Sequence, residues 1–524
     1  MRVDAITLEV FNHRLSAIAE EMGVALCRSA FSPNIKERRD FSCALFDGAG
    51  EMVAQAAHIP VHLGSTPLSV QAAIAQMPMA PGDVVILNDP YAGGTHLPDV
   101  TVVAPVFLPN RRRAPFGYVA NRAHHADIGG SAPGSMPLAT EIYQEGFRLP
   151  PVRIVARGRI VDDVLRLFLA NTRIADERRG DLLAQLTALR LGATRMRALV
   201  TQAGRETTAA AMGALQTYSA RRLSAALRGL PRGIYRAEDW MDDDGAGTER
   251  IPIRVAIHIG NGRVLVDFSG TAPQVRGGIN ANYAVTLAAV LYTFQLLGGG
   301  DIPANAGLLR PIRVIAPPGT LVNAECPAAV AGGNVETSQR IVDVLLKALA
   351  HAAPERIPAA SSGSMNNLAL GGYDPVRRRN FAYYETIAGG AGAGPGGPGV
   401  SGVHTHMTNT LNTPIEALEA VYPLRVTRYG LRPGRGGAGK YRGGQGIVRE
   451  IEALASMQAT LLTERRRLRP YGLQGGQGGQ YGRNELVSAG KVQILTGKIT
   501  WTLDPGERIR LMTPGGGGWG RRRR

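Results

Sequence analysis

The composition of residues 162 to 228 strongly favours α-helix. The stretch is rich in Leu, Ala and Arg, it contains no proline, and each of its glycines stands alone. Proline and paired glycines interrupt helices, so their absence predicts two or three long helices. Pro231-Arg232-Gly233 ends the stretch. These helices form an antiparallel pair or an arm that contacts a partner, and we predict part of a subunit interface there.

The rest of the chain alternates between strand-like and helix-like patterns. A chain of 524 residues is too long for one ordinary hydrophobic core. We therefore predict a multi-domain protein of mixed α/β (α+β) class with several mixed sheets. Its regions are 1–160 with the candidate metal site, the helical segment 161–235, a second α/β region at 236–384, and a glycine-rich, mainly β region at 385–524.

Hydrophobic spacing predicts individual elements within these regions. Residues 4 to 30 read as a helix with Leu8, Phe11, Leu15, Ile18 and Met22 on one face. Further helices are expected at Ala281 to Leu297, which is apolar enough to be buried, and at Val335 to His351, with Thr337 or Ser338 as its cap. Strands are expected within 41–65, 251–259, 263–268 and 312–315.

The charge and cysteine content narrow the class of protein. The formal net charge is +17, but the basic residues are scattered and form no known nucleic-acid module, so no nucleic-acid partner is expected. The three cysteines lack metal-binding or disulfide spacing, which favours a reducing compartment. The first five residues lack the apolar core of a signal peptide, and the apolar run at 281–297 contains polar side chains. We expect a cytoplasmic protein that does not enter a membrane.

Two clusters of metal-binding residue types follow strand-like segments. Asn88–Asp99 directly follows the strand-like run Asp83–Leu87, and His124–Gly130 lies some 25 residues further on. Each cluster combines carboxylate and imidazole groups with a flexible Gly-Gly pair. Sites on rigid scaffolds are commonly built where strands end. The clusters together predict one divalent metal site.

The spacing within the first cluster suggests the ligands. His96 and Asp99 are three residues apart, so one tight loop can direct both at one ion, while His124 or His125 can supply a third ligand and Asp40 a further carboxylate. Imidazole and carboxylate ligands suit Zn, Mn or Fe(II). The alternative is that the carboxylates cap turns and the histidines are hydrogen-bonded groups of the core.

Other segments give weaker indications of chemistry. Gly434–Tyr441 nearly matches a phosphate-binding loop, but a tyrosine replaces the required hydroxyl residue and no helix can readily start after it. Ser361–Ser364 and Cys326 have no adjacent base and are expected to be structural. His404 and His406 alternate as on one face of a strand, and could form a second metal site, line a polar pocket, or simply pack in a loop.

Several long motifs, taken together in order along the chain, closely resemble the hydantoinase B/5-oxoprolinase family. The motifs are Asn88–Thr101, His124–Gly130, Glu141–Gly146, Gly332–Arg340, Ser364–Asn367, His404–Thr413 and Thr513–Gly520. They span nearly the whole chain and are far more specific than a lone glycine fingerprint.

The resemblance implies one half of a two-component, ATP-dependent system. In that family a separate hydantoinase A-like component with an actin-like ATPase fold phosphorylates the substrate, and the B component, which carries a divalent metal ion, completes the opening of a cyclic amide such as a hydantoin or 5-oxoproline. Related proteins are subunits of ketone carboxylases. We therefore expect a hetero-oligomer with a hydantoinase A-like ATPase, which uses the ATP, and a small cyclic amide as substrate.

The resemblance also implies roles for individual residues. The metal ligands are Asp40, His96, Asp99 and His124, with Zn or Mn as the expected ion; no residues are assigned to another cofactor. His125 and Asp127 are placed beside the ligands as the catalytic acid/base or supporting groups. Adjacent side chains of an extended strand point in opposite directions, so the pattern leaves open which of His124 and His125 faces the ion.

Three functions compete at this point. The first is the hydrolase component, which the chain length favours because carboxylase subunits of this family are generally longer. The second is a subunit of an ATP-dependent ketone carboxylase. The third is a non-catalytic scaffold for the ATPase, which would tolerate the loss of His96 or Asp99.

Overall fold

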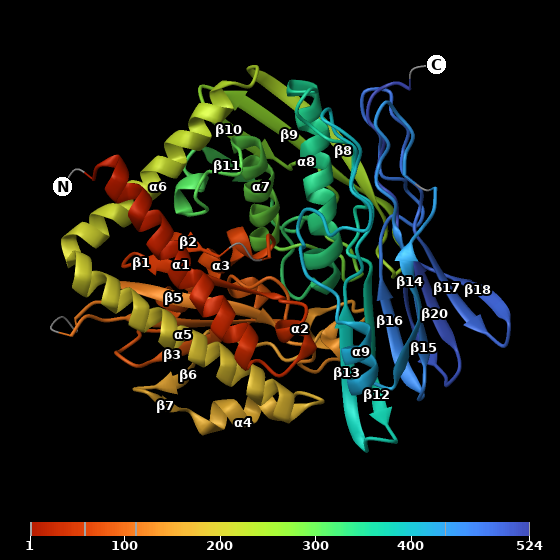
Figure 1. The fold of residues 1–524 in the computed structure, drawn as a ribbon, viewed down its shortest axis with the longest axis horizontal. Helices are drawn as coiled ribbons and strands as arrows, with labels where there is room; N and C mark the ends of the chain where they lie inside the picture. Colours follow the sequence, from red (N-terminus) through yellow and green to blue (C-terminus); the bar gives the residue numbers. More distant parts are fainter. Residues whose placement is uncertain (1–2, 57–58, 110–112, 435, 523–524) are drawn as a thin grey trace.

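The computed structural model describes residues 3–56, 59–109, 113–434 and 436–522, and these form four β-sheets with helices between and around them (Figure 1). The predicted mixed α/β, multi-sheet class is confirmed. The sheets are mostly antiparallel, and among the described strands β10 and β11 form the one parallel pair.

The first sheet has seven antiparallel strands in the order β2-β1-β5-β4-β3-β6-β7. Their bounds are β1 Phe41–Asp47, β2 Met52–Gln55, β3 Val84–Leu87, β4 Asp99–Val106, β5 Gly117–His124, β6 Val152–Ala156 and β7 Arg159–Ile160. β4 and β5 lie side by side near the middle of the sheet, and both are buried along their whole length.

Helices cover both faces of this sheet. Successive side chains of a strand point to opposite faces, so Cys43 and Leu45 pack in one hydrophobic cluster with α1 (Ala5–Ser29) and α5 (Ala175–Ala203). Ala44 and Phe46 pack in another cluster with α3 (His62–Gln76), α7 (Tyr283–Gly298) and α8 (Ser338–Ala352). A sheet buried on both faces is a rigid support for a site at its strand ends.

The stretch 162–228 is helical as predicted. It consists of α4 (Asp162–Ala170), α5 and α6 (Arg205–Arg228), and α5 packs against α1. Figure 1 shows α5 and α6 meeting at an angle on the outside of the molecule. A break at Gly204, whose φ of 84° is one that glycine adopts readily, separates α5 from α6.

The second sheet, in the order β11-β10-β9-β8, covers α7 and α8 from the other side (Figure 1). Its strands are β8 Gly233–Asp243, β9 Glu249–Gly260, β10 Arg263–Asp267 and β11 Ile312–Ile315. The helix predicted over 281–297 is α7, and 11 of its 16 residues are buried. The strands predicted at 251–259, 263–268 and 312–315 are also present.

Two further antiparallel sheets pack face to face at the C-terminal end, in the orders β13-β12-β16-β19 and β14-β15-β20-β17-β18. The strands are β12 Asn367–Asp374, β13 Arg379–Glu385, β14 Leu424–Leu431, β15 Ile447–Ala453, β16 Met457–Leu462, β17 Arg483–Ser488, β18 Lys491–Leu495, β19 Lys498–Leu503 and β20 Arg508–Met512. One short helix, α9 (Ile415–Val421), precedes β14.

Glycines allow neighbouring backbones to touch beside these sheets. A Cβ atom on Gly444 would lie 1.9 Å from the carbonyl oxygen of Val400, and one on Gly516 would lie 1.9 Å from that of Ala391. No other residue fits there, which explains the glycine-rich composition after residue 385. The segment Gly434–Tyr441, which only nearly matches a phosphate-binding loop, takes part in this packing from Gly436 onward. Its Arg435 lies outside the described residues.

Two local predictions are wrong. The strand pattern expected over 41–65 ends at Gln55, and α3 begins at His62, because Gly64 lets this segment pack closely as a helix against α7. The cap predicted at Thr337 or Ser338 is absent: α8 continues from a π-helical turn, Gly333–Thr337, and the Thr337 hydroxyl donates to the carbonyl of Ile279 instead. The short helix α2 (Pro33–Lys36) was not predicted. The division into four regions stays a prediction.

Candidate metal centre

The antiparallel pairing of β4 and β5 brings the two sequence clusters together. Asp99 begins β4 and lies directly opposite His124, the last residue of β5. His96 lies in the loop just before β4, where the amide of Asp99 donates to its carbonyl oxygen at 3.1 Å. The three side chains that the spacing singled out therefore meet at one end of the buried sheet.

The three side chains are arranged around one carboxylate oxygen. Asp99 Oδ1 is 3.2 Å from His96 Nε2 and 3.2 Å from His124 Nδ1. All three residues are buried, and their ligand atoms lie within 4.8 Å of one another; among the described residues no other group of three His, Cys, Asp or Glu is this close. Two ligand atoms, each about 2.1 Å from one ion and 90–110° apart, would be separated by about 3.0 to 3.4 Å.

Unpartnered nitrogens support the same fit. Neither ring nitrogen of His96 has a hydrogen-bond partner, although both are buried. A buried polar atom without a partner is costly, so such atoms are rare unless a ligand, a water or an ion satisfies them. The donor set of two imidazoles and one carboxylate fits a divalent transition-metal ion.

The second oxygen of the Asp99 carboxylate, Oδ2, is held by Thr95 and His62. Asp99 Oδ2 accepts a hydrogen bond from the Thr95 hydroxyl at 2.5 Å and lies 3.4 Å from His62 Nε2, while His62 Nδ1 is 2.8 Å from the hydroxyl of Ser42. These contacts leave Oδ1 directed at His96 and His124. The sequence patterns missed His62, because it is brought in by the unpredicted helix α3.

The pKa values of Asp99 and His124 favour the binding of a cation. Burial raises the pKa of the Asp99 carboxyl, but the nearby His96 and His62 outweigh this and hold its pKa well below the usual range. Burial lowers the pKa of His124 despite the Asp99 carboxylate beside it. The result is an ionised carboxylate next to a neutral His124 imidazole, the states in which these groups bind metals.

Two asparagines fix the loop that carries His96. Asn282, the cap of α7, donates from Nδ2 to the carbonyls of Pro90, Gly94 and Thr95 at 2.9 to 3.0 Å. Asn88 donates to the carbonyl of Leu97 at 2.8 Å. The loop conformation thus depends on a residue almost 200 positions away, a contact that no local pattern reveals.

Asp40 is not part of the three-residue cluster. Its carboxylate lies 3.9 Å from the guanidinium of Arg38, and its charge raises the pKa of His124. Its backbone carbonyl accepts the amide N–H of His124 at 3.0 Å. The structure therefore connects Asp40 to His124 chiefly through the backbone.

His125 and Asp127 have partners of their own. His125 Nε2 is 2.9 Å from Oε1 of Gln185 on α5, and burial together with Arg178 lowers its pKa to about 4. Asp127 forms an ion pair with Arg173 at 2.8 Å and accepts backbone N–H groups, including those of Gly129 and Gly134. Their contacts are those of groups that stabilise the end of β5, and the catalytic role stays a prediction.

An aromatic residue of the C-terminal half covers the centre. The ring of Tyr384 on β13 stacks on His124 with centroids 4.8 Å apart, and Arg38 lies over the same ring. The Tyr384 hydroxyl donates to Asn367 Oδ1 at 2.7 Å, and Asn367 Nδ2 donates to Glu336 at 2.7 Å. The segments 332–340 and 364–367, which belong to the motifs that carry the family resemblance, thus hold the side chain that covers His124.

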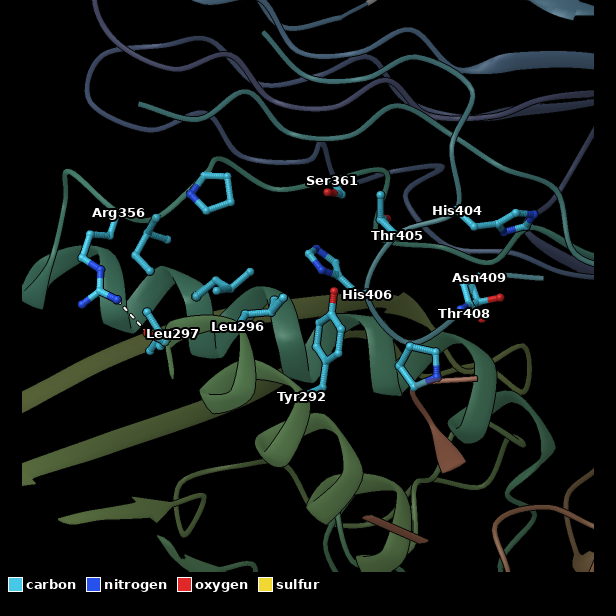
Figure 2. Close-up of a pocket in the computed structure, with 14 residues that line it drawn as sticks. Tyr292, Leu296, Leu297, Arg356, Ser361, His404, Thr405, His406, Thr408 and Asn409 are labelled. Atoms are coloured by element: carbon cyan, nitrogen blue, oxygen red, sulfur yellow. Dashed lines mark hydrogen bonds between the residues drawn. The ribbon is translucent and has the colours of Figure 1, made fainter. Parts of the chain in front are cut away.

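The remaining candidates lie elsewhere. His404 and His406 line a cavity shown in Figure 2 rather than join the three-residue cluster, and Ser361 lines the same cavity. Cys326 is exposed and accepts from Arg148 at 3.5 Å. Among the helices that the structure describes, none is both long and apolar enough to cross a membrane.

Comparison with known proteins gives a consistent family assignment. The sequence profile of the hydantoinase B/oxoprolinase family matches residues 4–522. An uncharacterized protein of Methanocaldococcus jannaschii is 43% identical over 99% of this chain and 91% of its own length. 5-Oxoprolinase 1 of Arabidopsis thaliana is 40% identical over 99% of this chain, which spans only 42% of that protein's length.

Solved structures share the fold over nearly the whole chain. The ATP-dependent caprolactamase from Pseudomonas jessenii superposes with a TM-score of 0.92 at 30% identity, covering 99% of this chain and 92% of that one. A nucleotide-free acetone carboxylase chain superposes with a TM-score of 0.90 at 18% identity, covering 99% and 76%. The second likeness is one of fold alone.

Proposed function

The chain belongs to the hydantoinase B/oxoprolinase family, and from this we propose that it is the metal-containing component of an ATP-dependent cyclic-amide hydrolase. Its substrate is a small cyclic amide, activated by phosphorylation on a hydantoinase A-like ATPase with which it forms a hetero-oligomer. The observation that carries the proposal is the buried cluster of His96, Asp99 and His124 with its unpartnered nitrogens.

In this proposal His96, Asp99 and His124 hold the divalent ion, Zn or Mn. When bound, such an ion lowers the pKa of a water molecule and polarises a carbonyl, which supplies both nucleophile and electrophile near neutral pH. Asp99 presents Oδ1 to the ion because Thr95 and His62 hold Oδ2. Tyr384 and the buried strand ends exclude bulk water from His124.

We propose supporting roles for His125 and Asp127, the two residues that the resemblance places in catalysis. Gln185 links His125 to β4, since the Nε2 of Gln185 donates to the carbonyl of Val100 at 2.9 Å. This bracing fixes the ends of both strands that carry Asp99 and His124. Asp127 in turn anchors the loop that follows β5. Asp40 acts through the backbone of His124 and through its charge.

We place the protein in the cytoplasm, where ATP is available and free thiols persist. No disulfide joins the three cysteines, all of which lie in the described part of the chain. Thiols of this kind stay reduced in the cytosol and tend to oxidise in secreted proteins.

Reconstitution with a hydantoinase A-like ATPase tests the proposal. ADP release is measured with hydantoin, N-methylhydantoin, 5-oxoproline and caprolactam, and separately with acetone plus bicarbonate. We expect release coupled to ring-opened product with at least one cyclic amide. Release only with a ketone and bicarbonate would identify a carboxylase subunit instead. Release that persists unchanged when Asp99 is replaced by alanine would favour a scaffold without chemistry of its own.

A further inference from the structure

A buried positive charge lies beside the metal centre on the same face of the sheet. Arg122 stands two residues before His124 on β5, and Thr101, which lies opposite Arg122, stands two residues after Asp99 on β4. Residues two apart on a strand share a face and are separated by about 7 Å along it. The Arg122 side chain therefore occupies the position next to the ligands.

Arg122 has no carboxylate partner. Its side chain is fully buried, and among the described residues it takes part in no ion pair. The other fully buried arginines that the structure describes each pair with a carboxylate: Arg38, Arg178, Arg340, Arg449 and Arg465. A buried charge is costly and is normally paired, so an unpaired one at this position suggests a use for the charge itself.

Hydroxyl groups take the place of a carboxylate around Arg122. Its three guanidinium nitrogens each donate to one hydroxyl oxygen, those of Thr101 at 2.8 Å, Ser65 at 2.5 Å and Ser69 at 2.6 Å. Both serine hydroxyls in turn donate to backbone carbonyls, so their oxygens are directed at the guanidinium. Such dipoles stabilise a charge without cancelling it, and the field of Arg122 is left to act on the centre.

The two serines belong to a polar stripe on α3. Ser65 and Ser69 follow His62 by three and seven residues, so the three side chains lie on one face of the helix. This face meets the sheet, where His62 contacts Asp99 and the serines contact Arg122. One helix face thus supports both the negative and the positive charge of the sheet.

The charged groups around the centre offset one another. Burial lowers the pKa of Arg122 to about 10 although the Asp99 carboxylate raises it, so the guanidinium is protonated near pH 7. Its charge offsets that of Asp99, and Arg38 offsets Asp40 at 3.9 Å. A divalent ion on the ligands would bring a charge that these groups do not balance. A buried centre of this kind favours an anion as its further ligand.

We propose that Arg122 is the specificity-determining residue that makes the metal centre select an anion, the phosphoryl group of the activated substrate, over an uncharged ligand. Its fixed charge weakens the binding of the metal ion and strengthens the binding of an anion next to that ion. Because its nitrogens are engaged by hydroxyls, Arg122 acts through its field and not by contact. The inference rests on the proposed function, in which the substrate arrives phosphorylated.

Two affinities that change in opposite directions test the proposal. Arg122→Met removes the charge, whereas Arg122→Lys keeps it and offers three donors to the three hydroxyls. Calorimetry measures Mn²⁺ binding to the metal-free chain and inorganic phosphate binding to the Mn²⁺-loaded chain. In Arg122→Met we expect Mn²⁺ to bind at least about tenfold more tightly and phosphate at least about tenfold more weakly. In Arg122→Lys both affinities should stay within about threefold of the wild type.

A merely structural arginine would give a different pattern. Loss of its hydrogen bonds would loosen the site and weaken the binding of Mn²⁺ and phosphate together. That result, or unchanged affinities in Arg122→Met, would overturn the proposal. Imidazole at pH 8 is an uncharged ligand for the loaded centre, and Arg122→Met should bind it as tightly as the wild type does. Imidazole binding that weakens as much as phosphate binding would also contradict a role of the charge.

A further variant separates charge from position. Ser69→Ala removes one hydrogen bond of the guanidinium but leaves its charge, so phosphate should bind within about threefold of the wild type. Equal effects of Ser69→Ala and Arg122→Met would overturn the proposal in favour of a positional role. A thermal unfolding scan establishes that each variant is folded, and Arg122→Gln, which also lacks the charge, replaces Arg122→Met if the latter does not fold.

Reconstitution with the ATPase identifies the source of the anion. Inorganic phosphate should inhibit ring opening by the wild-type pair, because it occupies the place of the phosphoryl group. Phosphate that binds without inhibiting would overturn the assignment to the activated substrate. A wild-type chain that binds neither Mn²⁺ nor Zn²⁺ would overturn the proposed function and this inference with it. Metal binding that is the same in wild type and Arg122→Met would overturn this inference alone.

Discussion

At the scale of single residues, His96 is the sharpest test of the metal centre. His96→Ala removes an imidazole whose two nitrogens have no hydrogen-bond partner and whose Nε2 faces the Asp99 carboxylate at 3.2 Å. We expect a loss of bound metal of more than about tenfold and loss of turnover, because one of three ligands is gone. Metal content is measured by mass spectrometry of the dialysed protein, and assembly with the ATPase by gel filtration.

A histidine outside the centre provides the control. His13 on α1 is exposed and pairs with Glu9, which lies outside the metal centre. His13→Ala should keep full metal content and activity. Wild-type metal content in His96→Ala would contradict the ligand assignment, even if activity were lost.

A second residue-scale prediction concerns pH and stability. Burial raises the pKa of Glu145 to about 8, although its carboxyl accepts the amides of Val330 and Ala331. The folded state then holds a proton that the unfolded state releases above about pH 4.5, so this contribution to stability is lost as pH rises towards 8. The change from 4.5 to about 8 corresponds to at most about 5 kcal/mol.

Glu145→Gln isolates this contribution. The glutamine keeps an acceptor for both amides and cannot ionise. The free energy of unfolding, measured by denaturant titration from pH 5 to 8, should fall less steeply in the variant than in the wild type. Parallel curves would show that Glu145 is ionised in the folded protein. Glu336, whose pKa burial also raises to about 8, adds a slope of the same sign to both proteins.

How far the site could be predicted also depends on single residues. The spacing of His96 and Asp99, with the second cluster at His124, was enough to predict a metal site. In the structure the ligand atoms of these three residues lie within 4.8 Å of one another. His62 and Tyr384 could not be predicted, since each reaches the centre through tertiary packing. Which of His124 and His125 faces the cluster follows from the pairing of β4 with β5, information that no single strand contains.

At the scale of secondary-structure elements, the packing of α3 on α7 links stability to the centre. A Cβ atom on Gly64 would lie 2.7 Å from Cα of Ala288, so Gly64→Ala must push the helices apart. We expect a loss of about 1–3 kcal/mol in unfolding free energy, and weaker metal binding because His62 begins the displaced helix. Chemical denaturation and metal titration measure the two effects.

Gly213 is the matched control for that change. It lies exposed in α6, and nothing lies within 4 Å of a Cβ atom there. Gly213→Ala should raise stability by up to about 1 kcal/mol through helix propensity and leave metal binding unchanged. Equal effects of the two variants would refute the steric argument.

The helices at 162–228 carry a prediction about assembly. Leu167 and Leu183 are 55% and 40% exposed on this segment, apolar surface that fits a contact with the ATPase. Adding the ATPase should slow backbone hydrogen exchange in α4 and α5, and leave β17 and β18 unaffected. Unchanged exchange throughout 162–228 would argue against an interface there.

Elements with a clear period were predicted well, and the failures have physical causes. The helices over 4–30, 162–228 and 281–297 are present because their apolar faces or their lack of helix breakers determine them locally. α3 was missed because its stability comes from contact with α7, and Pro67 within it reads as a helix breaker. Strand order could not be predicted, since it depends on pairings between distant segments.

At the scale of the whole molecule, part of the large positive charge is internal. Six of the arginines that the structure describes are fully buried: Arg38, Arg122, Arg178, Arg340, Arg449 and Arg465. Arg465 pairs with Asp239 and Asp343, while Arg122 donates mainly to the hydroxyls of Thr101, Ser65 and Ser69. Among the described residues more carboxylate than basic side chains are buried, so burial does not reduce the net positive charge that a partner would meet at the surface.

The order of strands in the last sheet has a consequence for biosynthesis. β20 lies between β15 and β17, although it is the last of these strands to leave the ribosome. Until residues 508–512 emerge, β15 and β17 each present an unpaired edge on the growing chain. The strands of the N-terminal sheet all lie within the first 160 residues, so they can pair before the C-terminal strands are synthesised. The half of the molecule with the metal ligands can thus form during translation, while the half that supplies Tyr384 closes over it afterwards.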